Sequence, residues 1–514
     1  MRFNPALLLG FASVSLAYSS ARTFRRSPDE DKASAVVDAF TLAWGGYWEN
    51  AFPNDTLRPI SNIGDNDRNK WGVTPIDALS TAAIMGQADI VQQILDFVPT
   101  INFTTTEEPD SVISVFETNI RYLAGLISGY DLLTGPYQDL APDSDKVEVL
   151  LDQARILADA ISFAFDTPSG VPSPNVYLNP EPRRSDGTQN GIAGIGTMIL
   201  EWTRLSDLTG DEKYTQLVQR AQDYLLHPAE SAEPFPGLIG TEVSLETGEF
   251  LDSRGGWSAG TDSFYEYLIK MYLYDPVFFE EYKDRWVLAA DSTIEYLASH
   301  PSSRPELTFL AEFNGTTLTP SSGHLASFSG GNFILGGILL NEQKYIDFGI
   351  NLTESYYATY EGCSSGIGPE GFRWHDDALP EGEENRLPPD DQVEFFEEAG
   401  FWVTSPYYIL RPETLESLYY SYRATGDTKY QDLAWEGFQR IMEVCRAGSG
   451  FSGLTNVREA DGGGYTDFME SFFLAETLKY AYLIFAEESD VQLKIDGPNG
   501  WVYNTEAHPV RVRG

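Results

Sequence analysis

Several acidic residues lie in segments that are otherwise apolar and are predicted to be helical. Glu117 is one of them, within the run 112–127. A helix places Arg121, four residues later, on the same face. A surface salt bridge would also explain this pair, but the helix is apolar on most sides, so we expect the pair to be buried. Burial favours the protonated form of a carboxyl group, the form that a general acid needs.

A second acidic pair follows a proline. Pro412 fits the first position of a helix, which puts Glu413 in the first turn and Glu416 on the same face. The helix dipole stabilises an ionised carboxylate there by a few tenths to about 1 kcal/mol, as suits a general base. The ordinary enrichment of acidic residues in a first turn would explain this segment equally well.

Further acids share this apolar setting. Asp262 and Glu266 have helical i,i+4 spacing, where like charges are unfavourable unless a cation or a sugar network separates them. Glu476 stands among aromatic residues, where an unpaired acid is costly. Glu201 occupies a similar helix position. So many acids on apolar helix faces predict that they project into one polar cavity.

Near the C-terminus, the run 503–509 contains Thr505 and Glu506. Hydroxyl and carboxylate oxygens suit a hard cation such as calcium. A turn rich in hydrogen-bonding side chains would explain this run equally well.

Long helical patterns must position these residues. The apolar periodicity predicts helices over Ala33–Ala51, Pro75–Phe97, Ser114–Leu133, Lys146–Phe165, Ile195–Thr209, Asp211–Leu226, Asp262–Leu273, Tyr282–Ala298, Asn332–Leu340, Gln343–Tyr360, Pro412–Thr425, Asp427–Cys445 and Asp467–Ala486. Gly210-Asp211 and Gly426-Asp427 each predict a helix end followed by the cap of the next helix. Repeated helical hairpins favour a closed ring of helices over a sheet of βαβ units. Residues 250–252 and 501–503 are expected to be hairpin arms in loops at one end of the ring.

The N-terminus is typical of a secreted protein. A positive start, a short apolar run and small residues predict a signal peptide over residues 1–21. Residues 22–35 are expected to be a short linker or pro-segment, and residues 36–510 one catalytic domain. Glycosylation sequons beginning at Asn54, Asn102, Asn314 and Asn351 agree with secretion. We expect no transmembrane helix, because the remaining chain has no sufficiently long apolar segment.

The overall charge excludes two classes of partner. The 77 Asp and Glu residues against 34 Lys and Arg give a formal net charge of -43. Such a surface repels nucleic acid and anionic membranes. Cys363 and Cys445 could form one disulfide, but their spacing establishes neither a bond nor a zinc site.

Seven motifs in order give the chain a resemblance to glycoside hydrolase family 47, the class I α-1,2-mannosidases, and most to the secreted fungal members. The similarity covers about residues 36–510. The motifs are Arg68-x-x-Trp71-Gly72 with Ile76-Asp77-Ala78-Leu79-Ser80-Thr81, Glu117-Thr118-Asn119-Ile120-Arg121, Asp262-Ser263-Phe264-Tyr265-Glu266-Tyr267-Leu268, Gly366-Ile367-Gly368-Pro369-Glu370, Arg411-Pro412-Glu413-Thr414-Leu415-Glu416-Ser417, Glu470-Ser471-Phe472-Phe473-Leu474-Ala475-Glu476-Thr477 and Asn504-Thr505-Glu506-Ala507-His508-Pro509.

The resemblance implies an all-α fold, an (α/α)7 barrel with a C-terminal β-hairpin plugging one end. It implies that Thr505 gives its hydroxyl and carbonyl oxygens to a calcium ion, which also holds the 2- and 3-hydroxyls of the mannose. Glu117 would be the general acid, directly or through a water molecule, Glu413 the base, and Asp262 the third essential carboxylate. The roles of these three acids are less firmly implied than the site itself. The expected substrate-binding residues are Asp77, Arg121, Glu201, Glu266, His324, Glu370, Arg411, Glu416, Phe472, Glu476 and Glu506.

Two departures from the family pattern affect these expectations. Many members have a disulfide whose first cysteine follows the histidine motif, but here Ser327 takes that place and the partner region 354–360 lacks cysteine. The family disulfide is therefore expected to be absent. Gly260 stands where endoplasmic-reticulum members have an arginine that restricts the glycan branch. A glycine predicts an open subsite and broader trimming.

Two functions compete on these grounds. The first is a secreted, calcium-dependent exo-α-1,2-mannosidase that hydrolyses high-mannose N-glycans with inversion, which fits well-separated carboxyl groups. The second is a glycan-binding lectin of the degradation-enhancing mannosidase-like type, with weak or no turnover. The three central acids and the calcium threonine are all present, which favours the enzyme. We expect a monomer.

Overall fold

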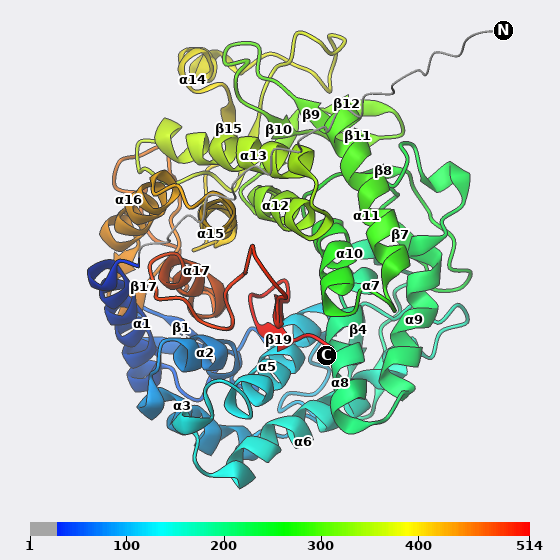
Figure 1. Cartoon of the computed structure of the whole chain (residues 1–514), viewed down its shortest axis with the longest axis vertical. Coiled ribbons are helices and arrows are strands. Elements are labelled where there is room, and N and C mark those ends of the chain that lie inside the picture. The colour runs from blue at the N-terminus through cyan, green and yellow to red at the C-terminus, as the bar shows by residue number, and fades with distance from the viewer. Residues whose placement is uncertain (1–27, 514) are drawn as a thin grey trace, which may run out of the picture.

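The computed structural model describes residues 28–513, and its long helices form a closed double ring (Figure 1). The outer ring consists of α1 (Glu30–Asn50), α3 (Ala88–Phe97), α6 (Ser144–Ile161), α9 (Lys213–Leu226), α11 (Glu280–Ser292), α13 (Gln343–Gly362) and α16 (Lys429–Val444). The inner ring consists of α2 (Val73–Ile84), α5 (Ala124–Leu133), α8 (Ile199–Thr209), α10 (Asp262–Tyr274), α12 (Ser329–Leu340), α15 (Glu413–Thr425) and α17 (Leu478–Leu483). Each inner helix packs against the next outer helix along the chain, and α17 packs against α1, which closes the ring. The predicted (α/α)7 barrel is confirmed.

Shorter helices extend or connect these elements. The α-helical ones are α4 (Val115–Glu117), α7 (Ile192–Gly196) and α14 (Val393–Ala399). The 3₁₀ turns are η1 (Val98–Thr100), η3 (Gln138–Leu140), η4 (Ser162–Phe165), η5 (Glu230–Ala232), η7 (Leu325–Phe328) and η8 (Asp390–Gln392). The π-helical segments are η2 (Thr118–Leu123), η6 (Thr293–Leu297) and η9 (Phe473–Thr477). Such π segments are frequent at functional sites, and η2 and η9 carry two predicted site residues, Arg121 and Glu476.

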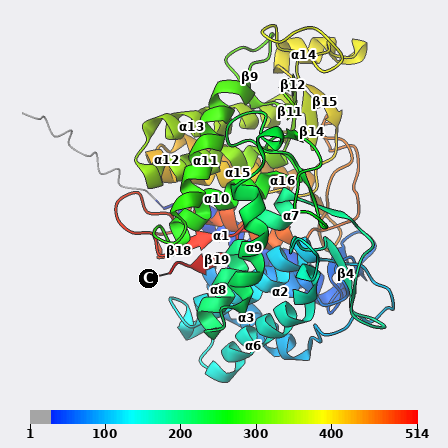
Figure 2. The same cartoon turned by 90° about the vertical axis from the view of Figure 1, so that its right-hand side faces the viewer.

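Small antiparallel sheets lie in the connections between helices. They contain β1 (Thr56–Arg58), β2 (Ile63–Asp65), β3 (Ile113–Ser114), β4 (Asn175–Tyr177), β5 (Arg183–Arg184), β6 (Gln189–Gly191), β7 (Glu242–Ser244), β8 (Arg254–Gly255), β9 (Ala298–Ser299), β10 (Phe309–Leu310), β11 (Glu312–Asn314), β12 (Thr317–Thr319), β13 (Ser321–Gly323), β14 (Gly371–Arg373), β15 (Trp402–Ser405), β16 (Arg446–Ala447) and β17 (Gly450–Phe451). Figure 2 shows β4, β14 and β15 toward one face of the ring. These sheets thus lie toward one end of the barrel, as predicted, but the loop that carries residues 501–503, expected at the same end, lies at the other.

The C-terminal hairpin enters the ring from the other face (Figures 1 and 2). Its strands β18 (Trp501–Tyr503) and β19 (Pro509–Arg511) are antiparallel, with Tyr503 opposite Pro509. Residues 504–508 form the connecting loop at the tip. Every residue of α2, the inner helix whose Ser80 contacts His508 of this loop, is buried. The predicted hairpin at 501–503 and its position as a plug are confirmed.

Three local expectations were wrong. The segment Pro75–Phe97 is two helices, because Gly86 turns the chain with a φ of 69° between α2 and α3. The last helical segment begins at η9, after an irregular stretch, and not at residue 467. Phe250 forms only an isolated bridge with Val243.

The expected helix ends at Gly210 and Gly426 are confirmed, since both glycines have a left-handed conformation. Asp211 and Asp427 accept hydrogen bonds from the amides of the second residue beyond each, at 3.1 and 3.0 Å.

The predicted signal peptide lies outside the described residues, and α1 begins at Glu30, six residues before the predicted domain boundary at 36. Within residues 28–513, no helix combines the length and apolarity that crossing a bilayer would require.

Candidate active site

A cavity of about 510 Å³ opens at the centre of the ring. It brings together most of the acids that the sequence singled out, from inner helices, from π segments and from the tip of the hairpin. The predicted residues that line it are Glu117, Arg121, Asp262, Glu266, Arg411, Glu413, Glu416, Phe472, Glu476, Thr505 and Glu506.

Four predicted residues do not line the cavity. Three of them contact lining residues, and Glu201 contacts Tyr267 and Asn504, which are the sequence neighbours of lining residues. The Nδ1 atom of His324 lies 3.0 Å from a carboxylate oxygen of Glu413. Glu370 accepts a hydrogen bond from Arg411 at 2.7 Å. The remaining two are Asp77, 3.7 Å from Arg121, and Glu201, which accepts hydrogen bonds from Tyr267 and Asn504. These residues hold the lining in place and do not face the cavity.

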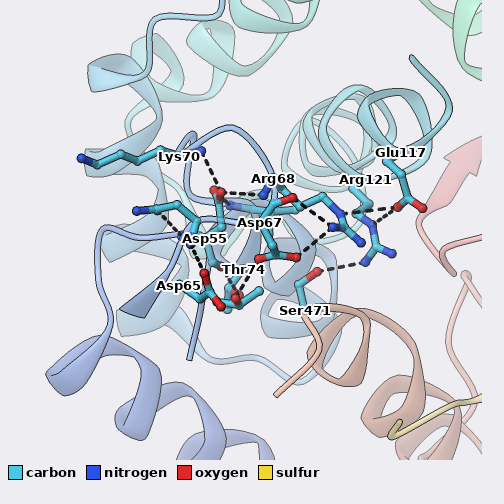
Figure 3. Close-up of polar contacts among 12 residues, drawn as sticks. Asp55, Asp65, Asp67, Arg68, Lys70, Thr74, Glu117, Arg121 and Ser471 are labelled. Atoms are coloured by element: carbon cyan, nitrogen blue, oxygen red, sulfur yellow. Dashed lines mark hydrogen bonds and ion pairs between the residues drawn. The ribbon is translucent and has the colours of Figure 1, made fainter. Parts of the chain in front are cut away.

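Arginines surround Glu117 (Figure 3). The Arg121 Nε donates to Glu117 at 2.7 Å, which is the predicted i,i+4 pair, and the Nε of Arg68 lies 3.6 Å from the same oxygen. Burial acts to raise the pKa of Glu117, but the positive charges of Arg121 and Arg68 outweigh it and lower the pKa below its usual value. The expectation that burial would keep Glu117 protonated is therefore not met, because two cations compensate for the lost hydration.

A buried aspartate holds the loop that supplies Arg68 (Figure 3). Asp55 accepts hydrogen bonds from the backbone amides of Arg68, Lys70 and Gly72 at 2.7–2.8 Å. Asn69 and Lys70 adopt left-handed conformations, with φ values of 71° and 61°. The carboxylate thus replaces the backbone hydrogen bonds that this irregular loop cannot make for itself, and so fixes the guanidinium group beside Glu117.

Glu413 is the first residue of α15, directly after the cap residue Pro412. Its carboxylate lies 3.3 Å from Arg411 and 3.0 Å from His324. Burial raises its pKa, but Arg411 and His324 together lower it below the usual value. An ionised carboxylate at the edge of the cavity is suited to accept a proton from water.

Asp262, the first residue of α10, has a different environment. Its carboxylate accepts hydrogen bonds from the amide and hydroxyl of Ser263 at 2.8 and 3.3 Å, and no cationic side chain among residues 28–513 donates to it. Burial raises the pKa of Asp262 to about 7, and the nearby charge of Glu266 acts in the same direction. This carboxyl group therefore retains its proton in weakly acidic solution.

Lys270 resolves the unfavourable spacing of Asp262 and Glu266. It lies one turn beyond Glu266 on α10, is buried, and forms an ion pair with it. Its Nζ also lies 3.3 Å from the carbonyl oxygen of Asn504. The cation thus neutralises Glu266 from the side away from Asp262, which lessens the i,i+4 repulsion, and it ties α10 to the hairpin tip.

The hairpin tip presents Thr505 to the cavity. Its amide donates to the hydroxyl of Tyr267 at 3.2 Å. The neighbouring Asn504 side chain donates to the carbonyl of Ile120 and to Glu201, at 3.0 and 3.1 Å. The tip is therefore held by hydrogen bonds to the inner helices on which the candidate acids lie.

The donor set around the tip fits a calcium ion held through few direct protein ligands. The cavity lining has eight carboxyl side chains and three arginines, so its acids outnumber its cations. Burial raises the pKa of three of these acids, Glu416, Glu476 and Glu506, above the usual value. Within the described part of the chain, the buried Oδ2 of Asp77 and Oε2 of Glu201 have no hydrogen-bond partner. Among residues 28–513, no group of three or more His, Cys, Asp or Glu side chains forms a metal cage. The oxygens of Thr505, with water between the ion and the acids, fit calcium.

Some site residues were not predicted. Arg68 and Glu470 line the cavity, and burial raises the pKa of Glu470 to about 7. Both belong to motifs that marked the family, so the motifs themselves held this signal. The buried lysines Lys270 and Lys479 follow Glu266 and Glu476 by four and three residues on the same helix face, which was a usable signal of pairing.

The structure also bears on the two departures from the family pattern. Cys363 and Cys445 are both buried and free, and Ser327 donates to the carbonyl of His324 at 2.6 Å in place of a cysteine. Gly260 lines the cavity with a φ of 93°, and a Cβ there would meet only a methyl group of Thr241, at 3.6 Å. This wall of the cavity is open, and its backbone conformation also favours glycine.

A closed ring of helical hairpins around an acid-rich cavity defines a helical-barrel glycoside hydrolase. The model described as glycosyl hydrolase family 47 matches residues 39–512, so the chain belongs to this family. Its relatives include a mannosyl-oligosaccharide alpha-1,2-mannosidase 1B of Aspergillus oryzae, 50% identical over 99% of this chain and 98% of that protein. A mannosyl-oligosaccharide alpha-1,2-mannosidase of Penicillium citrinum is 49% identical over 99% of this chain and 98% of the relative.

A solved structure agrees with these relatives. The alpha-1,2-mannosidase from Trichoderma reesei superposes with a TM-score of 0.93 and is 60% identical, covering 95% of this chain and all of that chain. The predicted family, fold and enzyme class are confirmed.

Proposed function

We propose that this protein is a calcium-dependent exo-α-1,2-mannosidase that removes terminal mannose from high-mannose N-glycans with inversion of the anomeric centre. The observation that carries the proposal is the meeting of Glu117, Asp262 and Glu413 with Thr505 in one cavity of about 510 Å³. Relatives about 50% identical over nearly the whole chain are named for activity on mannosyl-oligosaccharides, which supports the same substrate class here.

Glu413 is the proposed base. Arg411 and His324 keep its carboxylate ionised, so it accepts a proton from the water that attacks the anomeric carbon. Inverting hydrolases need room for this water between the sugar and the base. As Glu413 takes this proton, the water oxygen forms the new bond to the anomeric carbon, from the face opposite the leaving oxygen.

The proton for the leaving oxygen comes from a second carboxyl group. The motif match assigned this role to Glu117, but the charges around the two candidates favour Asp262. Its pKa of about 7 keeps it protonated in weakly acidic solution, whereas Arg68 and Arg121 keep Glu117 ionised. In this proposal Glu117 is the third catalytic carboxylate, and its negative charge stabilises the positive charge that develops on the sugar ring.

Thr505 would hold calcium through its hydroxyl and carbonyl oxygens. When bound, the ion supplies a fixed positive charge that binds the hydroxyl groups of the terminal sugar. Phe472 and the carboxylates of Glu266, Glu416, Glu476 and Glu506 would complete the sugar-binding surface.

We further propose that the protein follows the secretory pathway, where its glycoprotein substrates occur, and acts as a monomer. Its strongly acidic composition, with a net charge of -43, supports solubility without a partner.

A glycan-binding lectin on the same barrel is the competing function. A lectin needs complementarity to the ground state of the sugar, and it does not need carboxyl groups poised in opposite protonation states. The contrast between Asp262 and Glu413 therefore favours an enzyme.

The decisive experiment measures mannose release and glycan binding on the same preparations. Wild-type protein and Glu413→Gln are incubated with a high-mannose N-glycan, with calcium and after chelation. We expect calcium-dependent release by the wild type, and binding without release by Glu413→Gln. Binding without release by the wild type from pH 4 to 7 would contradict the enzyme and support the lectin.

A further inference from the structure

Behind the hairpin tip, buried side chains form a chain of hydrogen bonds outside the cavity lining. Ser80 Oγ lies 3.0 Å from Nδ1 of His508, and Nε2 of His508 lies 3.3 Å from a carboxylate oxygen of Asp77. Lys479 Nζ donates to the same Ser80 oxygen at 2.9 Å. These side chains come from three elements: Ser80 from α2, Lys479 from α17 and His508 from the hairpin loop.

The order serine, histidine, aspartate resembles a nucleophilic triad, but the contacts assign it a different role. Ser80, His508 and Asp77 are completely buried and none of them lines the cavity. Burial lowers the pKa of Lys479 to about 7, so in weakly acidic solution Lys479 is an ammonium group with only hydrogens to offer Ser80. The serine hydroxyl then donates its own proton to Nδ1 of His508. Nε2 then carries the ring hydrogen and donates to Asp77. A serine held in this way has no path to a substrate.

The same residues grip the backbone of the hairpin loop. Lys479 Nζ donates to the carbonyl of Ala507 as well as to Ser80. Ala507 has a φ of 56°, a left-handed conformation that is unfavourable for a non-glycine residue. The amide of His508 donates at 2.8 Å to Asn504, the residue before Thr505. The surrounding hydrogen bonds therefore hold a strained turn two residues from Thr505.

We propose that Ser80, His508 and Lys479 form a clamp that positions Thr505 to bind calcium. This inference deepens the proposed function and depends on Thr505 being the calcium ligand. The clamp residues are positioning residues, because they reach Thr505 only through the loop backbone. They preorganise the threonine oxygens, so their loss weakens calcium binding without removing a ligand.

Lys479 gives this proposal a sharp test. It faces Glu476, Glu506 and Asp77. If it acted only as a charge, its removal would make the cavity more negative and tighten calcium binding. A clamp predicts the opposite, because Lys479→Met frees the carbonyl of Ala507 and loosens the loop.

The experiment is calorimetric titration of calcium into the chelator-treated full-length protein. The variants are Ser80→Ala, Lys479→Met and His508→Gln. The control is Ser421→Ala, which removes another completely buried helix serine. The Oγ of Ser421 donates a 3.2 Å hydrogen bond to Thr353, which is not part of the hairpin. We expect about tenfold weaker calcium binding in each clamp variant and no change in the control. Excess calcium should restore kcat in Ser80→Ala, since the clamp positions the ion and not the substrate. Circular dichroism melting identifies any variant that fails to fold, and the other two then carry the test.

The outcomes separate the two levels of the proposal. Suppose that the wild-type protein binds calcium. If the folded variants then bind calcium equally well, or if Lys479→Met binds it more tightly, the clamp is overturned and the proposed activity is left intact. Wild-type protein that binds no calcium would overturn the role of Thr505, and the clamp with it.

Discussion

Two carboxyl groups at the cavity surface, those of Glu117 and Asp262, are both half-buried, yet their pKa values move in opposite directions. Two guanidinium groups lie within 4 Å of Glu117 and lower its pKa. Asp262 accepts hydrogen bonds from Ser263 and feels a weaker charge from Arg411, but burial and the like charge of Glu266 outweigh both, and its pKa rises to about 7. The comparison teaches that burial alone does not assign an acid or a base, because the nearest charges decide the direction.

The largest expected effect follows from removing the ionised carboxylate of Glu413, the proposed base. Glu413→Gln keeps the shape of the side chain but cannot accept a proton from water. We expect kcat to fall by about 10³-fold, within the usual range for acid–base groups, with little change in glycan affinity. Steady-state kinetics on a high-mannose glycan measure this, with the exposed Glu381→Gln as the control. A loss of less than tenfold would contradict the role of Glu413.

The pH profile tests the contrast between the two carboxyl groups directly. Because the pKa of Asp262 is raised to about 7, its protonated form is lost as the pH rises through 7, and kcat/KM should fall there. In Asp262→Asn we expect kcat/KM to be about 10²-fold lower, and we expect its pH profile to lack this alkaline limb. In Glu117→Gln the limb should remain. If the limb disappears in Glu117→Gln and persists in Asp262→Asn, Glu117 is the proton donor.

The sequence predicted the components of this contrast more readily than its direction. The acids on apolar helix faces correctly indicated an inward cavity, and the motifs placed Glu117 beside Arg121. The direction of the Glu117 pKa depended also on Arg68, which comes from a loop 49 residues earlier and reaches Glu117 only because Asp55 binds that loop. Periodicity carries no information about such a contact.

The helix boundaries show the same limit. Residues 75–97 have a continuous apolar pattern, but the chain turns at Gly86, which tertiary packing places between an inner and an outer helix. The buried lysines were also missed, because lysine is rarely buried, although their spacing after Glu266 and Glu476 indicated the pairing.

A milder change would sharpen the comparison by removing one cation. In Arg68→Met, Glu117 loses one of its two nearby guanidinium groups, so its pKa should rise. Because the proposed reaction needs Glu117 ionised, the acidic limb of kcat/KM should move to higher pH, so activity is lost first in the most acidic solutions. Arg58→Met, which removes an arginine paired with Asp65 on the neighbouring hairpin, is the control. An unchanged acidic limb in Arg68→Met would mean that Glu117 does not depend on Arg68.

The smallest expected effect concerns the open wall at Gly260. Its φ of 93° makes any side chain unfavourable, so Gly260→Ala should lower the unfolding free energy by about 1–2 kcal/mol with nearly unchanged trimming. Gly260→Arg should carry a similar stability cost and also slow the removal of some branches several-fold. Chromatography of the glycan isomers, with thermal melting, separates the two effects. Identical isomer profiles for Gly260→Arg and Gly260→Ala would show that this wall does not select branches.

The most direct test of the central claim is proton NMR of mannose release from a high-mannose N-glycan, recorded early enough to identify the first anomer. An inverting reaction, with water activated by Glu413, predicts that β-mannose appears first, that release stops when calcium is chelated, and that it resumes when calcium is restored. First appearance of α-mannose, or release that is indifferent to chelation, would contradict the account.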